Sequence, residues 1–71
     1  MPKAKMDVCD CCYNVSKQLA KKSEFLWHAE RYLKDAKKKK HAGCARMWKR
    51  IIADERQHVR MLKSAMKKGI C

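Results

Sequence analysis

The sequence predicts an all-α protein, an antiparallel two-helix hairpin that dimerises into a four-helix bundle. Residues that favour helices dominate from Lys17 onward, and apolar residues recur every three or four positions in two segments. A lysine-rich stretch that ends at Gly43 separates the segments. Because a chain of 71 residues buries only about 60% of its unfolded surface, such a domain usually needs a partner, a metal or a covalent staple.

The first helix is expected at about residues 7–41. Asp7 is a plausible N-cap, since its carboxylate accepts hydrogen bonds from free backbone N–H groups. The lysines of 37–40 and His41 suit the partial negative charge of a helix C-terminus. The predicted inner stripe is Cys12, Val15, Leu19, Ser23, Leu26, Glu30 and Leu33.

The second helix is expected at about residues 44–69, with Gly43 in the turn and fraying near Gly69. Its inner stripe is Cys44, Trp48, Ile51, Glu55, His58, Leu62 and Ala65, widened by Met47, Ile52, Val59 and Met66. The short connection makes the two helices antiparallel neighbours within one domain, residues 1–71. Two helices cannot cover both stripes, whereas four can, and a homodimer or higher oligomer is therefore expected.

Charge and hydropathy limit the functional classes. Nineteen Lys and Arg against seven Asp and Glu give a net charge of +12, which favours nucleic acid or an acidic protein as partner. Lys37, Lys38, Lys39 and Lys40 are candidate phosphate contacts. No apolar run of the ~18 residues that a membrane span needs is present. The N-terminal segment has no apolar signal-peptide region, so we expect a cytoplasmic protein without a membrane partner.

Two acidic residues and a histidine interrupt the apolar stripes. Glu55 lies mid-stripe on the second helix, His58 follows one turn later on the same face, and Glu30 lies between Leu26 and Leu33. A buried carboxylate needs a compensating partner, and carboxylate with imidazole is an ordinary ligand set for iron, manganese or zinc. Paired hairpins supply two copies of each residue, the ligand set of dinuclear carboxylate bundles. Pairing with lysine or contact with water is the alternative.

The segment 45–63 resembles the Glu-x-x-His helix of rubrerythrins and the wider ferritin-like superfamily, through Glu55 and His58. The resemblance implies a dinuclear iron centre that reacts with oxygen or peroxide or oxidises ferrous iron. The family pattern, counted along the chain, points to Glu24 as the ligand of the first helix, while the helix face favours Glu30. The chain resembles half of such a bundle, as in encapsulin-associated ferritins, whose site forms between subunits.

The five cysteines form a second candidate site. An antiparallel hairpin brings Cys71 back near Cys11 and Cys12, with Cys9 adjacent, so a thiolate metal site or redox pair is conceivable there. Cys12 and Cys44 also suit a role as small apolar residues.

These patterns lead to two functional hypotheses. The first is a ferritin-like homodimer with two metal ions, most simply iron, with Glu30 or Glu55 bridging and His58 completing each coordination sphere. If it is an enzyme, it is an oxidoreductase of ferroxidase or peroxidase type. The second is a small basic hairpin that binds nucleic acid or an acidic partner without catalysis.

Overall fold

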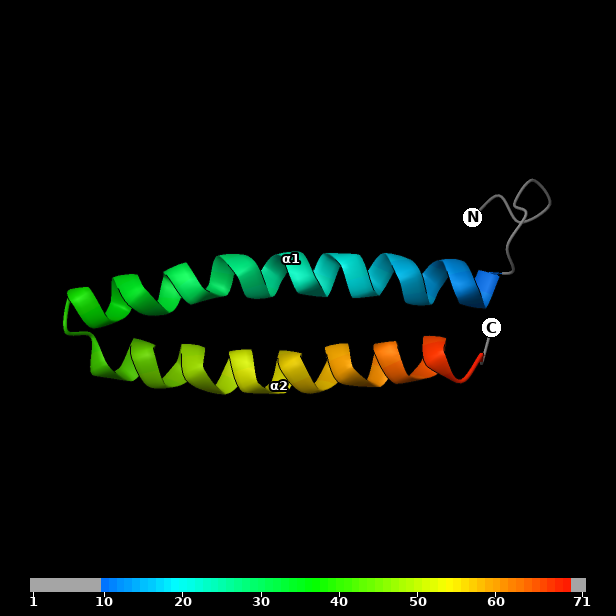
Figure 1. Cartoon of the computed structure of the whole chain (residues 1–71). Coiled ribbons are helices and arrows are strands. Elements are labelled where there is room, and N and C mark those ends of the chain that lie inside the picture. The colour runs from blue at the N-terminus through cyan, green and yellow to red at the C-terminus, as the bar shows by residue number, and fades with distance from the viewer. Residues whose placement is uncertain (1–9, 70–71) are drawn as a thin grey trace.

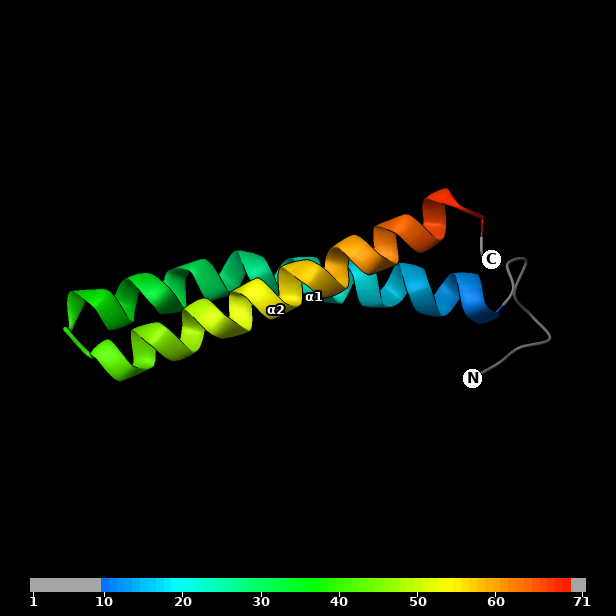
Figure 2. The same cartoon turned by 90° about the horizontal axis from the view of Figure 1, so that it is seen from below.

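The protein is a hairpin of two long helices in the computed structural model, which describes residues 10–69. Helix α1 spans Asp10–Lys38 and α2 spans Ala42–Lys67, with no strand among the described residues. The helices lie side by side and antiparallel (Figure 1), and their axes cross at a shallow angle (Figure 2). The predicted helical hairpin is confirmed. Asp7, the expected N-cap, lies outside the described residues.

The turn between the helices comes earlier than the sequence pattern suggested. α1 ends at Lys38 rather than near His41, and α2 begins at Ala42, so Gly43 lies in its first turn. Lys40 adopts a left-handed conformation with φ 60°. The amide of His41 donates to the carbonyl of Ala36 at 2.9 Å and the amide of Lys40 to that of Lys37 at 3.0 Å. This is the Schellman arrangement, with Lys40 where glycine is usual.

The helices meet along one strip of each, the interhelical interface. Its residues follow the alternating three- and four-residue spacing of coiled coils. They are Cys12, Val15, Leu19, Lys22, Leu26, Ala29, Leu33 and Ala36 of α1, and Ala45, Trp48, Ile52, Glu55, Val59 and Leu62 of α2, all buried or half-buried. On α1 this strip holds Lys22 and Ala29, and the predicted inner residues Ser23 and Glu30 are exposed beside it.

Small side chains allow close packing near the turn. Ala29 and Ala36 are buried in α1, as is Ile52 in α2. The rings of Tyr32 and Trp48 lie against each other with centroids 4.9 Å apart. Ala29, Ala36 and Ile52 are the only buried residues in the described part of the chain. The core is therefore a single narrow layer.

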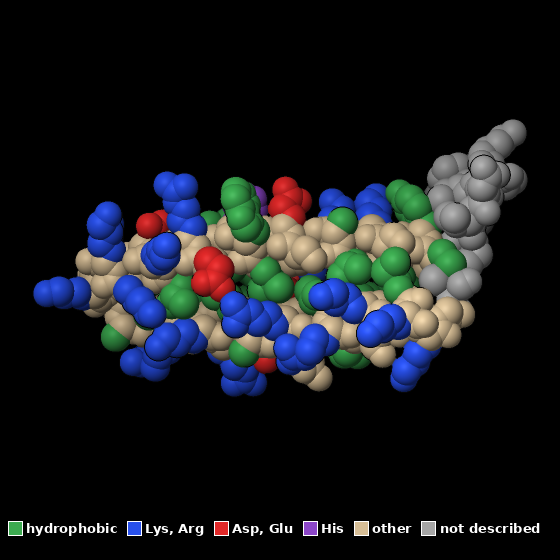
Figure 3. Space-filling model, viewed as in Figure 1, with side chains coloured by type: hydrophobic (Ala, Val, Ile, Leu, Met, Phe, Trp, Pro, Cys, Tyr) green, Lys and Arg blue, Asp and Glu red, His purple; other side chains and the backbone are tan. Residues whose placement is uncertain are grey.

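Much apolar surface stays in contact with water. Exposed large side chains are Trp27, Tyr32, Met47, Met61 and Met66. Apolar side chains line the junction of the two helices on the face shown in Figure 3, among many lysines and arginines. Within residues 10–69, neither helix combines the length with the apolar character that crossing a bilayer requires.

The left-handed conformation of Lys40 provides a direct test of the turn. A non-glycine side chain in this conformation costs roughly 1–2 kcal/mol. We expect Lys40→Gly to raise the free energy of unfolding by about 1 kcal/mol, measured by chemical denaturation followed by circular dichroism. Lys39→Gly, one residue earlier, is the matched control and should leave stability unchanged or lower it. Equal effects of the two substitutions would contradict the assigned turn.

Candidate functional site

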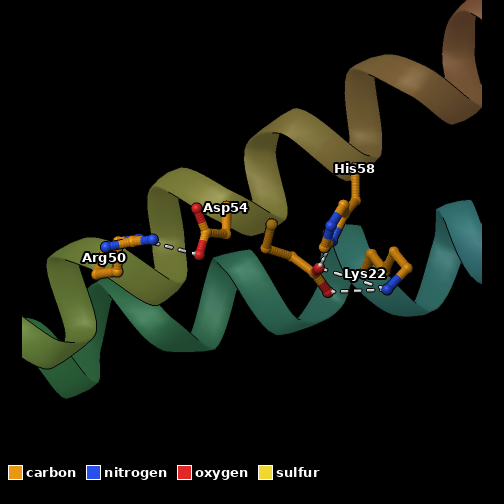
Figure 4. Close-up of polar contacts among 5 residues, drawn as sticks. Lys22, Arg50, Asp54 and His58 are labelled. Atoms are coloured by element: carbon orange, nitrogen blue, oxygen red, sulfur yellow. Dashed lines mark hydrogen bonds and ion pairs between the residues drawn. The ribbon is translucent and has the colours of Figure 1, made fainter.

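Glu55 is the acidic residue at the interhelical interface, in the middle of α2. Its side chain is 16% exposed. The Nζ atom of Lys22, on α1, lies 3.4 Å from Oε1 and 3.5 Å from Oε2 of the Glu55 carboxylate. His58, one turn later, places Nδ1 2.8 Å from Oε1 (Figure 4). Since an ionised carboxylate only accepts hydrogen bonds, Nδ1 carries the proton in this contact. The result is a Lys22–Glu55–His58 cluster.

The cluster favours the charged form of Glu55. The hydrogen bond from His58 lowers the pKa of this carboxyl below its ordinary value of 4.5, and the hydrogen bond and positive charge of Lys22 lower it further. Partial burial acts in the opposite direction, because it disfavours a charge. The hydrogen bonds and charges outweigh the burial, so Glu55 is a carboxylate at neutral pH.

Glu30 lies apart from this cluster. Its carboxylate accepts a hydrogen bond from Arg56 Nη2 at 2.7 Å, and both side chains are about half exposed. Arg56 and His58 are two residues apart on α2 and so point about 160° away from each other. Glu30 and His58 are therefore on opposite sides of the hairpin. No group of three His, Cys, Asp or Glu side chains that could hold a metal is present within residues 10–69.

The remaining predicted site residues are spread over the hairpin. Glu24 is exposed on α1. Cys11 is exposed and Cys12 half-buried near the start of α1, whereas Cys9 and Cys71 lie outside the described residues. The run of Lys37, Lys38, Lys39 and Lys40 is exposed at the turn. The predicted thiol site thus stays untested, and the lysines form a separate basic end.

Lys22 is the residue of the cluster that the sequence reasoning missed. A signal for it exists, because Lys22 follows Leu19 by three residues and precedes Leu26 by four, the spacing of the interface itself. The predicted inner face of α1 contained Ser23 instead of Lys22. That one-residue difference also placed Glu30, instead of Ala29, on the inner face about two turns later.

No protein-family model matches this sequence, and comparison with curated proteins and with solved structures also gives no match.

The pKa of Glu55 sets a pH dependence of stability. Because the folded-state pKa is lowered, the stabilisation is present above the ordinary value of 4.5 and is lost as the pH falls through the lower folded value. We expect the melting temperature to drop as the pH falls from about 5 to about 3, and Glu55→Gln to flatten that drop. Asp54→Asn, which removes an exposed carboxylate paired with Arg50, is the control and should keep the wild-type slope.

A charge exchange tests the pairing of Lys22 with Glu55. Lys22→Glu should lower the free energy of unfolding by about 1–3 kcal/mol, because it places two carboxylates together at the interface. Lys22→Glu combined with Glu55→Lys should recover most of that loss. The neighbouring exposed Lys21→Glu should have little effect. Failure of the double variant to recover stability would show that the two side chains do not pair.

Proposed function

We propose that the chain forms a homodimeric four-helix bundle in which Glu55 and His58 of both copies hold a metal centre. The observation that carries this proposal is the 2.8 Å contact between Glu55 and His58 in the middle of α2. Metal-binding histidines usually donate one ring N–H to a carboxylate, which orients the ring and leaves the other nitrogen for the metal. The Nδ1 contact to Glu55 leaves Nε2 of His58 for that role.

The surface around His58 supports assembly with a second copy. Beside the interhelical interface, α2 carries a second row at three- and four-residue spacing, Cys44, Met47, Ile51, Asp54, His58, Met61 and Ala65, in which the charged members are Asp54, paired with Arg50, and His58. Met61 is 60% and Met47 47% exposed in the single hairpin. An open hollow beside His58 is lined by Met61, Leu62, Gln18 and Lys22. A second hairpin on this row would bury the methionines and bring two His58 side chains together.

The ligand count also requires a second copy. One hairpin offers one carboxylate and one imidazole at this point, whereas a two-fold pair offers two of each. Iron is the metal that the ferritin-like resemblance favours, two ions per dimer, with manganese and zinc as alternatives. When bound, iron would supply the redox chemistry with oxygen, peroxide or ferrous iron that this resemblance implies.

Lys22 opposes metal binding in this arrangement. It already balances the charge of Glu55 at 3.4 Å, and a divalent cation would have to displace its ammonium group. The long, 30% exposed side chain of Lys22 has room to swing into water. Glu30 is paired with Arg56 on the opposite side of the hairpin from His58, so it would join the centre only if that ion pair opened and α1 rotated toward the second row. Glu24 is the other acidic residue of α1 considered for that position.

Metal content and mass, measured on the same untagged preparation, test the proposal. We expect a dimer that retains iron, manganese or zinc, with metal lost in Glu55→Gln and in His58→Ala. Asp35→Asn and His28→Ala remove an exposed carboxylate and an exposed imidazole on α1 and should retain it. Lys22→Met should bind metal more tightly than the wild type, because it removes the competing cation.

Two results would end the metal proposal. One is a protein that stays monomeric and binds no transition metal at micromolar concentrations. The other is metal binding that the Glu55 and His58 variants share equally with their controls. Glu30→Gln and Glu24→Gln, compared in the same assay, identify the α1 ligand if metal is bound.

A further inference from the structure

Trp27 is the most exposed large apolar residue of the described chain, with 76% of its surface accessible. It lies on α1, and the adjacent His28 ring meets it edge to face with centroids 5.2 Å apart. The indole is therefore held at the surface by a neighbour on its own helix. An exposed tryptophan of this kind gains nothing from the interhelical interface.

The proposed dimer does not account for Trp27 either. Tyr32 of α1 shares a surface hollow with Cys44 of α2, and Gln18 shares another with His58, so Tyr32 and Gln18 mark the side of α1 next to the second row. Trp27 precedes Tyr32 by five residues, which turns it about 140° away from that side. A second copy seated on the second row leaves the indole in water.

Cations follow Trp27 along the same face of α1. Arg31, Lys34 and Lys38 come after it at steps of four, three and four residues, and all four side chains line one open surface hollow. At 1.5 Å per residue this row is about 16 Å long. We call Trp27, Arg31, Lys34 and Lys38 the Trp27 face.

The balance of charge at this hollow is positive. Lys37 adds a fourth cation to its lining, against two acids, Glu30 and Asp35. The Glu30 carboxylate is already neutralised by Arg56 at 2.7 Å. An anionic ligand is therefore attracted to the Trp27 face, in keeping with the net charge of +12.

We infer that the Trp27 face binds single-stranded nucleic acid, with a base stacked on the Trp27 indole and phosphates on Arg31, Lys34 and Lys38. An exposed aromatic ring beside a row of cations is the combination that binds single strands without sequence preference. A duplex keeps its bases stacked internally and cannot use the indole in this way. The inference is independent of the proposed metal centre, which lies on another side of the hairpin.

Other anionic partners fit this face less well. A membrane surface would gain little from it, because Trp27 is the only large apolar side chain among the four residues and interfacial helices need a continuous apolar face. An acidic peptide would pair with the cations but has no base to stack on the indole. Single-stranded nucleic acid uses both features.

Fluorescence anisotropy with a labelled oligothymidine of about 16 nucleotides tests the inference. We expect binding that weakens steeply between about 50 and 200 mM salt. Trp27→Ala should weaken it about fivefold or more, whereas Trp27→Phe, which keeps a ring, should retain most of it. Arg31→Ala with Lys34→Ala should also weaken binding and reduce its salt dependence.

The control variant is Lys63→Ala with Lys67→Ala, which removes the same charge from α2. Its affinity should stay near that of the wild type, and circular dichroism should show equal helicity in all variants. Equal losses in the two double variants, or no effect of Trp27→Ala, would overturn the inference, since binding would then depend on net charge alone. Polyglutamate that competes as well as the oligonucleotide, in a Trp27-dependent manner, would also overturn it in favour of an acidic protein.

Discussion

The ion pair between Lys22 and Glu55 is the contact on which the arrangement of the two helices depends. It crosses an otherwise apolar interface at 3.4 Å, with each side chain less than a third exposed. Sliding one helix past the other by a turn would set the Glu55 carboxylate against apolar side chains without its partner, which lowers stability. The pair therefore selects one register, as single polar residues do in coiled coils. That register also places Trp48 of α2 beside Tyr32 of α1.

The hairpin buries little of its surface. Ala29, Ala36 and Ile52 are its buried residues within 10–69, and a layer this thin supplies little of the stabilisation that offsets the ordering of the chain. Anything that binds only the folded form, whether a second copy, a metal or a nucleic acid, adds to its stability by mass action. The proposed assembly with a second copy would therefore add to the stability of the hairpin, and the exposed methionines of α2 are the side chains that it would cover.

Different sides of the hairpin carry different chemistry. The second row of α2 is mainly apolar apart from Asp54 and His58, and the His58 ring contacts the carboxylate of Glu55. The opposite side carries the exposed pair of Glu30 and Arg56. The outer face of α1 presents Trp27 with its cations. Because these groups are on separate sides, a protein–protein contact at the second row and an anion at the Trp27 face do not compete for the same surface.

Local periodicity was enough to predict the two helices and the position of Glu55 at the interface with His58 one turn later, because helical spacing depends only on nearby residues. The short connection was enough to predict the antiparallel order of the helices. The sequence by itself did not determine the partner of Glu55. The predicted stripe on α1 included Ser23 and not Lys22, and which of the two faces α2 depends on the rotation of α1 about its axis. Similarly, Lys40 rather than Gly43 takes the left-handed position at the turn. Only the packing of the two helices fixed the rotation of α1, since it follows from contacts between residues far apart in the chain, such as Lys22 with Glu55 and Tyr32 with Trp48.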